Sequence, residues 1–309
     1  YQDIIDDLWI DKFLNLDPEI ISAVNQKKIS SKYGSKINKS FFVDILKNID
    51  QENICKFEIM NKYKNIDISN YLKEFLHINW KEFCLEWNNN GEELYLQLIL
   101  LGKLIKENGG KSQIYSSKPR NNKFIQIIKW IEEINNRLNS EDISQLLYDI
   151  SNEDLLFKYF YNKNIDKEIN KFDLSLDLSR FKLLQDKIYK IKEGFFTEFV
   201  RIFIQLAYIK LNTLKKSLSI FNFNDLIKTV ENKYLLSDLT NDKSLSDIQN
   251  RFKCVLVDEF QDTDNIQWSI IKKFFCTKNH FLLCVGDPKQ AIYKFRGGDI
   301  ETYLEAKSD

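Results

Sequence analysis

Residues 252–264 read FKCVLVDEFQDTD and residues 281–290 read FLLCVGDPKQ. Each stretch begins with a short, continuous apolar run, at 252–257 and 281–285, which is typical of strands buried on both faces of a parallel sheet. Between the two runs, residues 265–275 place isoleucine and phenylalanine side chains at helical spacing. Strand, helix and strand together predict a βαβ unit, and therefore an α/β fold for this part of the chain.

Polar residues stand where both predicted strands end. Asp258 and Glu259 follow the first strand, and Gly286 and Asp287 follow the second. Active sites in parallel sheets lie beyond the carboxyl ends of the strands. Of two adjacent carboxylates, one can hold Mg²⁺, directly or through water, while its neighbour orients the water that attacks a γ-phosphate. The alternative is that Asp258 and Glu259 only cap the helix that follows them.

The part of the chain before these strands, residues 1–218, has the periodicity of helices. Residues 69–87 carry apolar side chains three and four positions apart, with Ser69 as the expected N-cap. The same spacing recurs at residues 124–138 and 195–209. We therefore expect a predominantly helical region ahead of the βαβ unit.

Local signals predict where some of these helices begin and end. Asp17, Pro18 and Glu19 read as an N-cap, a proline in the first turn and an acid favoured by the helix dipole. Polar stretches predict three loops, at residues 88–91, 108–117 and 162–171.

The charge balance limits how the protein could bind nucleic acid. The chain has 309 residues with 45 Lys and Arg against 45 Asp and Glu, so no global basic field exists and any contact with DNA must be local. Basic clusters at 27–32, 118–123 and 210–216 could contact phosphate; the alternative is that each is a solvated face. An aromatic content of 14% argues against disorder.

Cysteine usage and hydropathy indicate the compartment. Five scattered cysteines without CxxC spacing suggest neither a disulfide framework nor a zinc site, so we expect a reducing compartment and a cytoplasmic location. No apolar run approaches the roughly 20 residues of a membrane span. The chain starts at Tyr1 without an initiator methionine, which we take as the mark of an excised fragment.

The two strand-end stretches together resemble the second and third helicase motifs of the UvrD/Rep superfamily 1 DNA helicases. The resemblance is carried by residues 257–264 (VDEFQDTD) and 286–300 (GDPKQAIYKFRGGDI). The sequence at 288–291 and 299–306 resembles the RecB branch of this family more than UvrD or AddA. Upstream, residues 221–227 resemble the Phe-Asp-Asp-Leu segment that precedes the second motif, with Asn in place of the first acid.

This resemblance implies a fold and a division of the chain. Residues 219–309 would be part of a RecA-like P-loop motor domain, called 1A, with motifs II and III. Residues 1–218 would be a large all-α insertion into it, called 1B. The nearest match to the phosphate-binding GxxxxGK[ST] loop, residues 105–112, has Ile at its first position and reads better as a helix stop. The true loop, the later motifs and the nuclease domain would therefore lie outside residues 1–309.

The resemblance also implies roles in ATP hydrolysis, residue by residue. Asp258 would ligate Mg²⁺, directly or through water, and Glu259 would be the catalytic base. Gln290 would contact the γ-phosphate or its water. Gln261 and Asp262 would couple the nucleotide site to the rest of the motor.

Three residues of the third motif would bind DNA. Tyr293 and Phe295 would stack on unpaired bases of single-stranded DNA, and Arg296 would pair with phosphate or with an acid lining the cleft. For Tyr293 and Phe295 the alternative is packing in the core. Stacking and phosphate contacts read no sequence, which suits an enzyme that moves along any strand.

The function that the family implies is ATP-dependent helicase and exonuclease activity in double-strand-break repair and recombination. The expected cofactors are ATP and Mg²⁺; the expected partners are single-stranded DNA, duplex ends and RecC- and RecD-like subunits, without a membrane. Residues 1–309 alone are expected to be inactive. The alternatives are an AddA- or UvrD-type helicase, or a non-catalytic DNA-binding or assembly module of the same fold.

Overall fold

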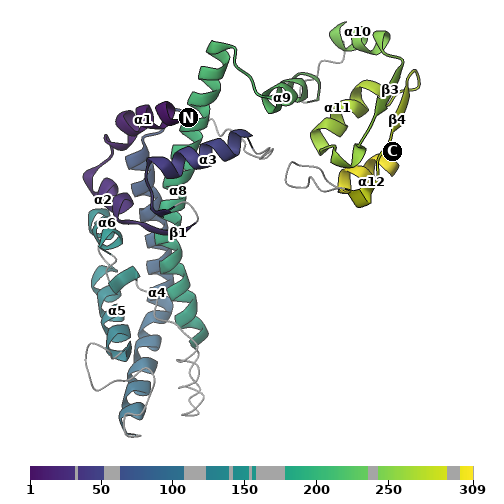
Figure 1. The fold of residues 1–309 in the computed structure, drawn as a ribbon. Helices are drawn as coiled ribbons and strands as arrows, with labels where there is room; N and C mark the ends of the chain where they lie inside the picture. The colour runs from purple at the N-terminus through teal and green to yellow at the C-terminus, as the bar shows by residue number, and fades with distance from the viewer. Residues whose placement is uncertain are drawn as a thin grey trace. The chain divides into compact units, whose positions relative to one another are not determined.

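The computed structural model describes residues 1–31, 34–51, 63–107, 123–138, 142–152, 155–157, 178–235, 243–290 and 300–308 (Figure 1). The chain divides into two compact units. One contains Tyr1, Val43–Ile59 and Tyr208–Asp309, and the other contains Gln2–Phe42 and Met60–Ala207. The boundary that we predicted at residues 218/219 stays a prediction.

The unit formed by Gln2–Phe42 and Met60–Ala207 is mostly helical. Its elements are α1 (Gln2–Leu8), a π-helical turn (Trp9–Phe13), α2 (Pro18–Gln26), α4 (Ile68–Glu107), α5 (Lys123–Arg137), α6 (Ile143–Ser151) and a 3₁₀ turn (Leu155–Phe157). Helices α3 (Lys39–Gln51) and α8 (Leu178–Leu218) each have residues in both units. The periodicity did not predict the antiparallel hairpin of β1 (Lys28–Ser31) and β2 (Gly34–Lys36).

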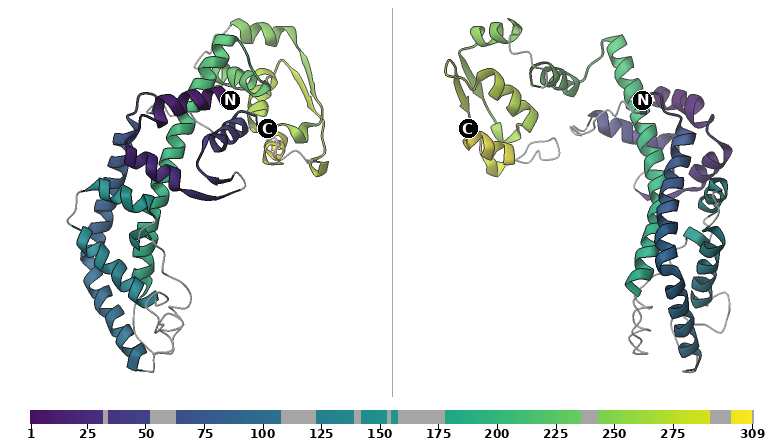
Figure 2. Two further views of the ribbon diagram at one scale, coloured as in Figure 1. Left: turned by 60° about the vertical axis from the view of Figure 1, so that its left-hand side comes forward. Right: turned by 180° about the vertical axis from the view of Figure 1, so that it is seen from behind.

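The long helices α4 and α8 run side by side in every view (Figures 1 and 2). Aromatic side chains at helical spacing fill the core around them: the ring centroids of Phe42 and Phe203 are 4.4 Å apart, and those of Trp87 and Trp130 are 5.7 Å apart. Ion pairs also join the two helices, as between Arg180 and Glu93 at 2.9 Å. Among the described residues, no helix is long and apolar enough to cross a membrane.

Two of the predicted local signals in α4 are wrong. The helix begins at Ile68, and Asp67 accepts the N–H of Asn70, whereas the Ser69 hydroxyl accepts the N–H of Asp17. The predicted loop at 88–91 lies inside the helix. A Cβ on Gly91 would lie 2.5 Å from the Trp87 indole, so this glycine makes room for a buried ring rather than ending the helix.

The predicted start of α2 is confirmed in position but not in its contacts. Asp17 is the N-cap residue and Pro18 occupies the first turn, yet the Asp17 side chain makes no capping hydrogen bond and instead pairs with Lys73. The two other predicted loops, at 108–117 and 162–171, lie outside the described residues.

The C-terminal part of the other unit contains the predicted βαβ arrangement. Its elements are α9 (Phe223–Tyr234), α10 (Lys243–Arg251), β3 (Cys254–Val257), α11 (Asn265–Phe275), β4 (Phe281–Cys284), a 3₁₀ turn (Pro288–Gln290) and α12 (Ile300–Ser308). Strands β3 and β4 are parallel, with Cys254 opposite Phe281 and Val257 opposite Cys284. The predicted strand, helix and strand are therefore confirmed.

The prediction that both faces of the strands are buried is wrong for the described structure. Leu256, Phe281 and Leu283 are 63%, 61% and 41% exposed. Alternate residues on a strand face opposite sides of the sheet, and in the described part of the chain β3 and β4 pair only with each other. Val257 shares a pocket with Ile270 of α11, so α11 covers one face, while the other face is exposed as far as the structure describes the chain.

Candidate active site

Strands β3 and β4 end at the same edge of the sheet, and backbone hydrogen bonds connect the segments that follow them. The N–H of Val285 donates to the Val257 carbonyl at 2.8 Å, and the N–H of Phe260 donates to the Val285 carbonyl at 2.9 Å. These bonds bring the segment after β3, which carries Asp258 and Glu259, next to the segment after β4. The two polar strand ends therefore form one site, as expected for a parallel sheet.

The segment after β3 turns sharply at Glu259. Its φ of 51° and ψ of 42° are left-handed, a conformation that costs a non-glycine residue about 1–2 kcal/mol. The Asp258 carboxylate supports the turn by accepting the N–H of Glu259 at 2.9 Å, and a 3₁₀ turn (Phe260–Asp262) follows. Both acidic side chains are exposed. Strained backbone held in place by its surroundings is characteristic of functional sites.

Gln261 connects this turn to the second strand end. Its side chain is buried, its Nε2 donates to Glu259 Oε2 at 2.6 Å, and its Oε1 accepts the N–H of Asp287 at 3.0 Å. One side chain therefore links the Glu259 carboxylate with the segment after β4.

Gly286 allows this close approach. A Cβ at this position would lie 2.5 Å from Gln261 Oε1 and 2.9 Å from the Phe260 nitrogen. Because even the smallest side chain would collide with the turn, only glycine fits here without moving Gln261.

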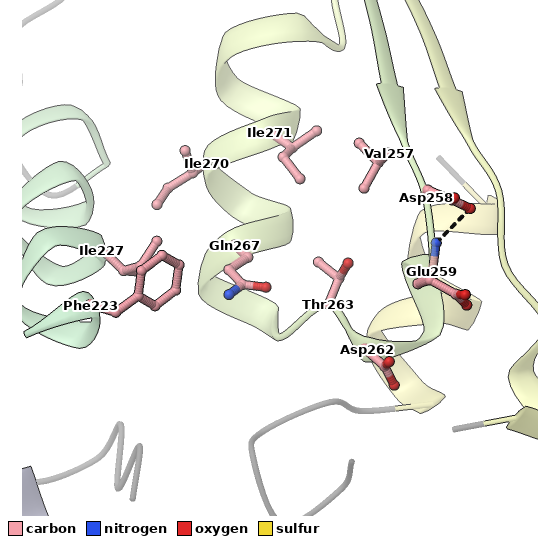
Figure 3. A pocket seen from close by; sticks show the side chains of 10 residues that line it. All are labelled: Phe223, Ile227, Val257, Asp258, Glu259, Asp262, Thr263, Gln267, Ile270 and Ile271. Carbon is pink, nitrogen blue, oxygen red and sulfur yellow. Dashed lines mark hydrogen bonds between the residues drawn. The ribbon is translucent and has the colours of Figure 1, made fainter. Parts of the chain in front are cut away.

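A pocket of about 460 Å³ opens beside the turn (Figure 3). Three carboxylates, those of Asp258, Glu259 and Asp262, line one side. The remaining lining residues are mostly apolar and come from α9, β3 and the region of α11: Phe223, Ile227, Val257, Thr263, Gln267, Ile270 and Ile271. Figure 3 shows Phe223 and Ile227 on the side of the pocket away from the carboxylates.

Asp264, rather than either predicted residue, caps α11. Its carboxylate accepts the N–H of Gln267 at 2.8 Å, while the Gln267 side chain accepts the N–H of Asp264 at 3.3 Å. The alternative in which Asp258 and Glu259 only cap the following helix is therefore wrong. Asp262 also lines the pocket, and its Oδ1 is buried without a hydrogen-bond partner in the described part of the chain.

The structure brings together four of the five residues that we assigned to the nucleotide. Asp258, Glu259 and Asp262 line the pocket. Gln261 does not line it but donates a hydrogen bond to the Glu259 carboxylate. Gln290 lies exposed in the turn after β4, where its Nε2 donates to Asp287 Oδ2 at 3.3 Å; it does not line the pocket.

The predicted DNA-binding residues, Tyr293, Phe295 and Arg296, lie outside the described residues. Phe223 and Ile227 of α9 also belong to the site, although we did not predict them from the sequence. Their spacing of one helical turn, within the segment 221–227 that resembles the family, was the available signal.

The carboxylates beside the turn are oxygen ligands of the kind that bind a divalent metal together with a nucleotide. Within the described ranges, no cluster of three or more His, Cys, Asp or Glu side chains could hold a metal ion. Mg²⁺ in nucleotide sites is usually bound by one or two carboxylates, by water and by the phosphates of the substrate. The exposed Asp258 carboxylate at the end of β3 suits that role.

Two basic residues that could have contacted phosphate make contacts within the protein. Lys27 pairs with Glu193 and lies 4.6 Å from the centroid of the Phe196 ring. Lys215 pairs with Asp50 and Asp225. Among the described residues, Cys84, Cys254, Cys276 and Cys284 are free thiols.

Comparison with known proteins identifies the family. The model of the UvrD/REP helicase N-terminal domain matches residues 20–309. The RecBCD enzyme subunit RecB of Buchnera aphidicola subsp. Acyrthosiphon pisum (strain APS) is 31% identical over 317 residues, covering 100% of this chain and 23% of the relative. RecBCD enzyme subunit RecB of Mycolicibacterium smegmatis is 58% identical over 59 residues, which cover 19% of this chain and 5% of that protein.

The chain thus spans about a quarter of the first relative, at 23% of its length. The RecBCD enzyme subunit RecB of Mycobacterium tuberculosis (strain ATCC 25618 / H37Rv) is 42% identical over 97 residues, which cover 31% of this chain and 8% of that protein. The family model covers most of the chain, and the family implies a P-loop motor fold, with which the parallel βαβ unit agrees. The chain belongs to the UvrD/REP helicase family.

Proposed function

We propose that this chain is part of the motor of a RecB-like DNA helicase and exonuclease subunit. The full-length protein would couple ATP hydrolysis to translocation along DNA and to unwinding in double-strand-break repair and recombination. The observation that carries the proposal is the left-handed Glu259, whose carboxylate lies on the acidic side of the pocket and is held by Gln261. The matched helicase family and the RecB relatives support it.

Each acidic residue at the end of β3 would have a separate task. Asp258 would bind Mg²⁺, and Glu259 would accept a proton from the water that attacks the γ-phosphate. When bound, ATP supplies the transferable phosphoryl group and Mg²⁺ neutralises its charge. Gln261 would hold the Glu259 carboxylate toward that water, because its amide is itself fixed by the Asp287 N–H.

The same amide offers a path from ATP hydrolysis to DNA. Gln261 joins Glu259 to Asp287, and the turn that follows carries Gln290, which would sense the γ-phosphate. Residues 291–299 come next and include Tyr293, Phe295 and Arg296, for which we propose contacts with single-stranded DNA. A change at the nucleotide would therefore be passed from Gln261 to Asp287, and along the chain that follows it to the DNA-binding residues.

The open face of the sheet supports a larger motor domain. A two-stranded sheet is marginally stable alone, and the exposed Leu256, Phe281 and Leu283 form an apolar surface that further strands or helices would cover. We propose that residues 219–309 belong to such a RecA-like domain 1A and that residues 1–218 form the helical insertion 1B. The phosphate-binding loop would come from another strand of that sheet.

The relatives also bear on the assembly in which the full-length protein works. Because the relatives are subunits of a RecBCD enzyme, we propose RecC- and RecD-like partners, DNA ends as substrate, nuclease activity and a cytoplasmic location. The cofactors would be ATP and Mg²⁺.

Strand displacement by the full-length protein tests this function. With a blunt-ended duplex, Mg²⁺ and the RecC- and RecD-like subunits, we expect unwinding with ATP and none with a non-hydrolysable ATP analogue. Duplex binding without nucleotide-dependent unwinding would instead favour the non-catalytic DNA-binding or assembly module. Unwinding by the full-length protein without the RecC- and RecD-like subunits, and with no degradation of DNA, would favour a UvrD-type helicase over the RecB type.

A further inference from the structure

Lys215, near the end of α8, lies between two carboxylates. Its Nζ donates to Asp50 Oδ1 at 2.5 Å and to Asp225 Oδ2 at 2.8 Å. The side chains of Lys215, Asp50 and Asp225 are only 12%, 3% and 15% exposed. One largely buried ammonium group therefore joins three segments: the end of α3, the end of α8 and the start of α9.

The oxygens around this lysine have further partners. The Tyr1 hydroxyl donates to Asp50 Oδ2 at 2.6 Å, and the Asn222 amide donates to the Asp50 carbonyl at 3.1 Å. The N–H of Asn222 donates to Asp225 Oδ2 at 2.9 Å. A buried cluster of charged side chains has a specific geometry when each of them is hydrogen-bonded. The loss of one side chain leaves the charges of the others without a partner.

The charge balance makes Lys215 the essential member. Burial of the ammonium lowers the pKa of Lys215, but hydrogen bonds and charge from Asp225 and Asp50 outweigh this effect, so that the pKa is raised overall. Without the lysine, Asp50 and Asp225 would face each other as buried carboxylates. Their repulsion would move the first turn of α9 away from α3.

That first turn forms a wall of the candidate active site. Asp225 and Asn222 form a capping box that fixes the start of α9. Phe223 lies within this turn and Ile227 one turn later, and both line the pocket that contains Asp258 and Glu259. Asp225, which pairs with Lys215, is therefore two positions along the chain from both Phe223 and Ile227.

The other end of α9 is held by a different contact. The rings of Tyr234 and Phe274 pack edge to face, with centroids 5.0 Å apart, and Phe274 is a buried residue of α11. Loss of the Lys215 contacts should therefore release the N-terminal part of α9 while its C-terminal part stays against α11.

We propose that Lys215 is a positioning residue for the nucleotide site, because its bridge between Asp50 and Asp225 holds the Phe223 and Ile227 wall of the pocket in place. This inference rests on the proposed ATPase function of that pocket. It also gives α8 a direct connection to the site, since a movement of the helix end would be passed to α9 through one ion pair.

The test compares Lys215→Met with Lys216→Met in the full-length protein. Lys216 is the adjacent residue of α8 and is exposed, so its substitution removes a charge without touching the bridge. Asp225→Asn serves as a second variant, because the asparagine amide oxygen can still accept the N–H of Asn222 in the capping box while one ion pair is lost. Two quantities are measured: hydrogen exchange of the α9 amides and the KM and kcat of DNA-stimulated ATP hydrolysis.

We expect Lys215→Met and Asp225→Asn to raise amide exchange in the first two turns of α9 by about tenfold or more, with Lys216→Met unchanged. The KM for ATP should rise by about tenfold while kcat changes less, since the wall does not touch the reacting atoms. Unchanged exchange in α9, or a lower kcat with an unchanged KM, would overturn the inference. If the wild type hydrolyses no ATP, the proposed function fails, and exchange in α9 still decides whether Lys215 positions the wall.

Discussion

The amide nitrogen of Gln261 lies 2.6 Å from the carboxylate of Glu259, and the amide oxygen of the same side chain accepts the N–H of Asp287. Gln261 is 3% exposed, so water does not compete for these bonds. The orientation of the Glu259 carboxylate is therefore fixed by the segment after β4. A glutamate assigned as a catalytic base gains its direction from a neighbour that does not itself line the pocket.

Replacement of Gln261 should reduce the rate of hydrolysis more than the binding of ATP. Gln261→Leu removes both bonds at similar volume, and a misplaced base can cost about 10²-fold in rate. We expect kcat to fall by that order in steady-state ATPase assays of the full-length protein, with KM little changed. Gln26→Leu, at an exposed position of α2, is the control. A kcat equal to that of the control would show that Gln261 does not orient the base.

A methyl group at Gly286 should disturb the same link through packing. Gly286→Ala would place its Cβ against Gln261 Oε1 and the Phe260 nitrogen, so we expect a loss of about 1–3 kcal/mol in the free energy of unfolding. ATPase activity should fall along with it. Urea denaturation followed by circular dichroism measures the first effect. Wild-type stability in this variant would contradict the close approach of the two strand ends.

The left-handed backbone of Glu259 makes a prediction about stability. Glu259→Gly removes the steric conflict at φ of 51°, whereas Glu259→Ala retains it. We expect the glycine variant to be more stable than the alanine variant by about 1 kcal/mol, although glycine gains more entropy on unfolding. Both variants should be inactive. If the alanine variant is the more stable of the two, the turn is not strained.

The helical unit should lose stability at alkaline pH. Burial, followed by the charge of Glu198, raises the pKa of Tyr71 to about 12 from 10.0. Between these values the folded state holds a proton that the unfolded state has lost, so the free energy of unfolding falls as pH rises. Tyr71→Phe should flatten this fall in urea titrations at pH 7 to 12. Tyr148→Phe, at a 59% exposed site, is the control and should behave as the wild type.

The sequence predicted best those features that depend on neighbours along the chain. Apolar runs of strand length predicted β3 and β4, and the place of Asp258 and Glu259 followed from the end of a strand. Contacts across the fold were beyond such patterns. The Ser69 hydroxyl, for example, accepts the N–H of Asp17, which lies 52 positions away, and no local pattern shows this contact.

The same limit applies to the site. Capping signals were plausible for Asp258 and Glu259, yet Asp264 makes the bonds to α11. Lys215 looked like a basic surface residue because its partners are 165 and 10 positions away. The second bond of Gln261 depends on the meeting of two strand ends. The motif predicted the acidic residues at the end of β3, whereas the place of Phe223 and Ile227 in the pocket and the bonds of Gln261 depend on tertiary packing.

The most direct test of the assignment of Glu259 is a comparison of ATP binding and ATP hydrolysis in the Glu259→Gln variant of the full-length protein. Binding is measured by equilibrium titration with a fluorescent ATP analogue, and hydrolysis in a single turnover with excess enzyme and single-stranded DNA. Glu305→Gln, at an exposed site of α12, is the control. We expect nearly unchanged binding and a hydrolysis rate reduced by about 10²–10⁴-fold. Hydrolysis at the rate of the Glu305→Gln control would contradict it.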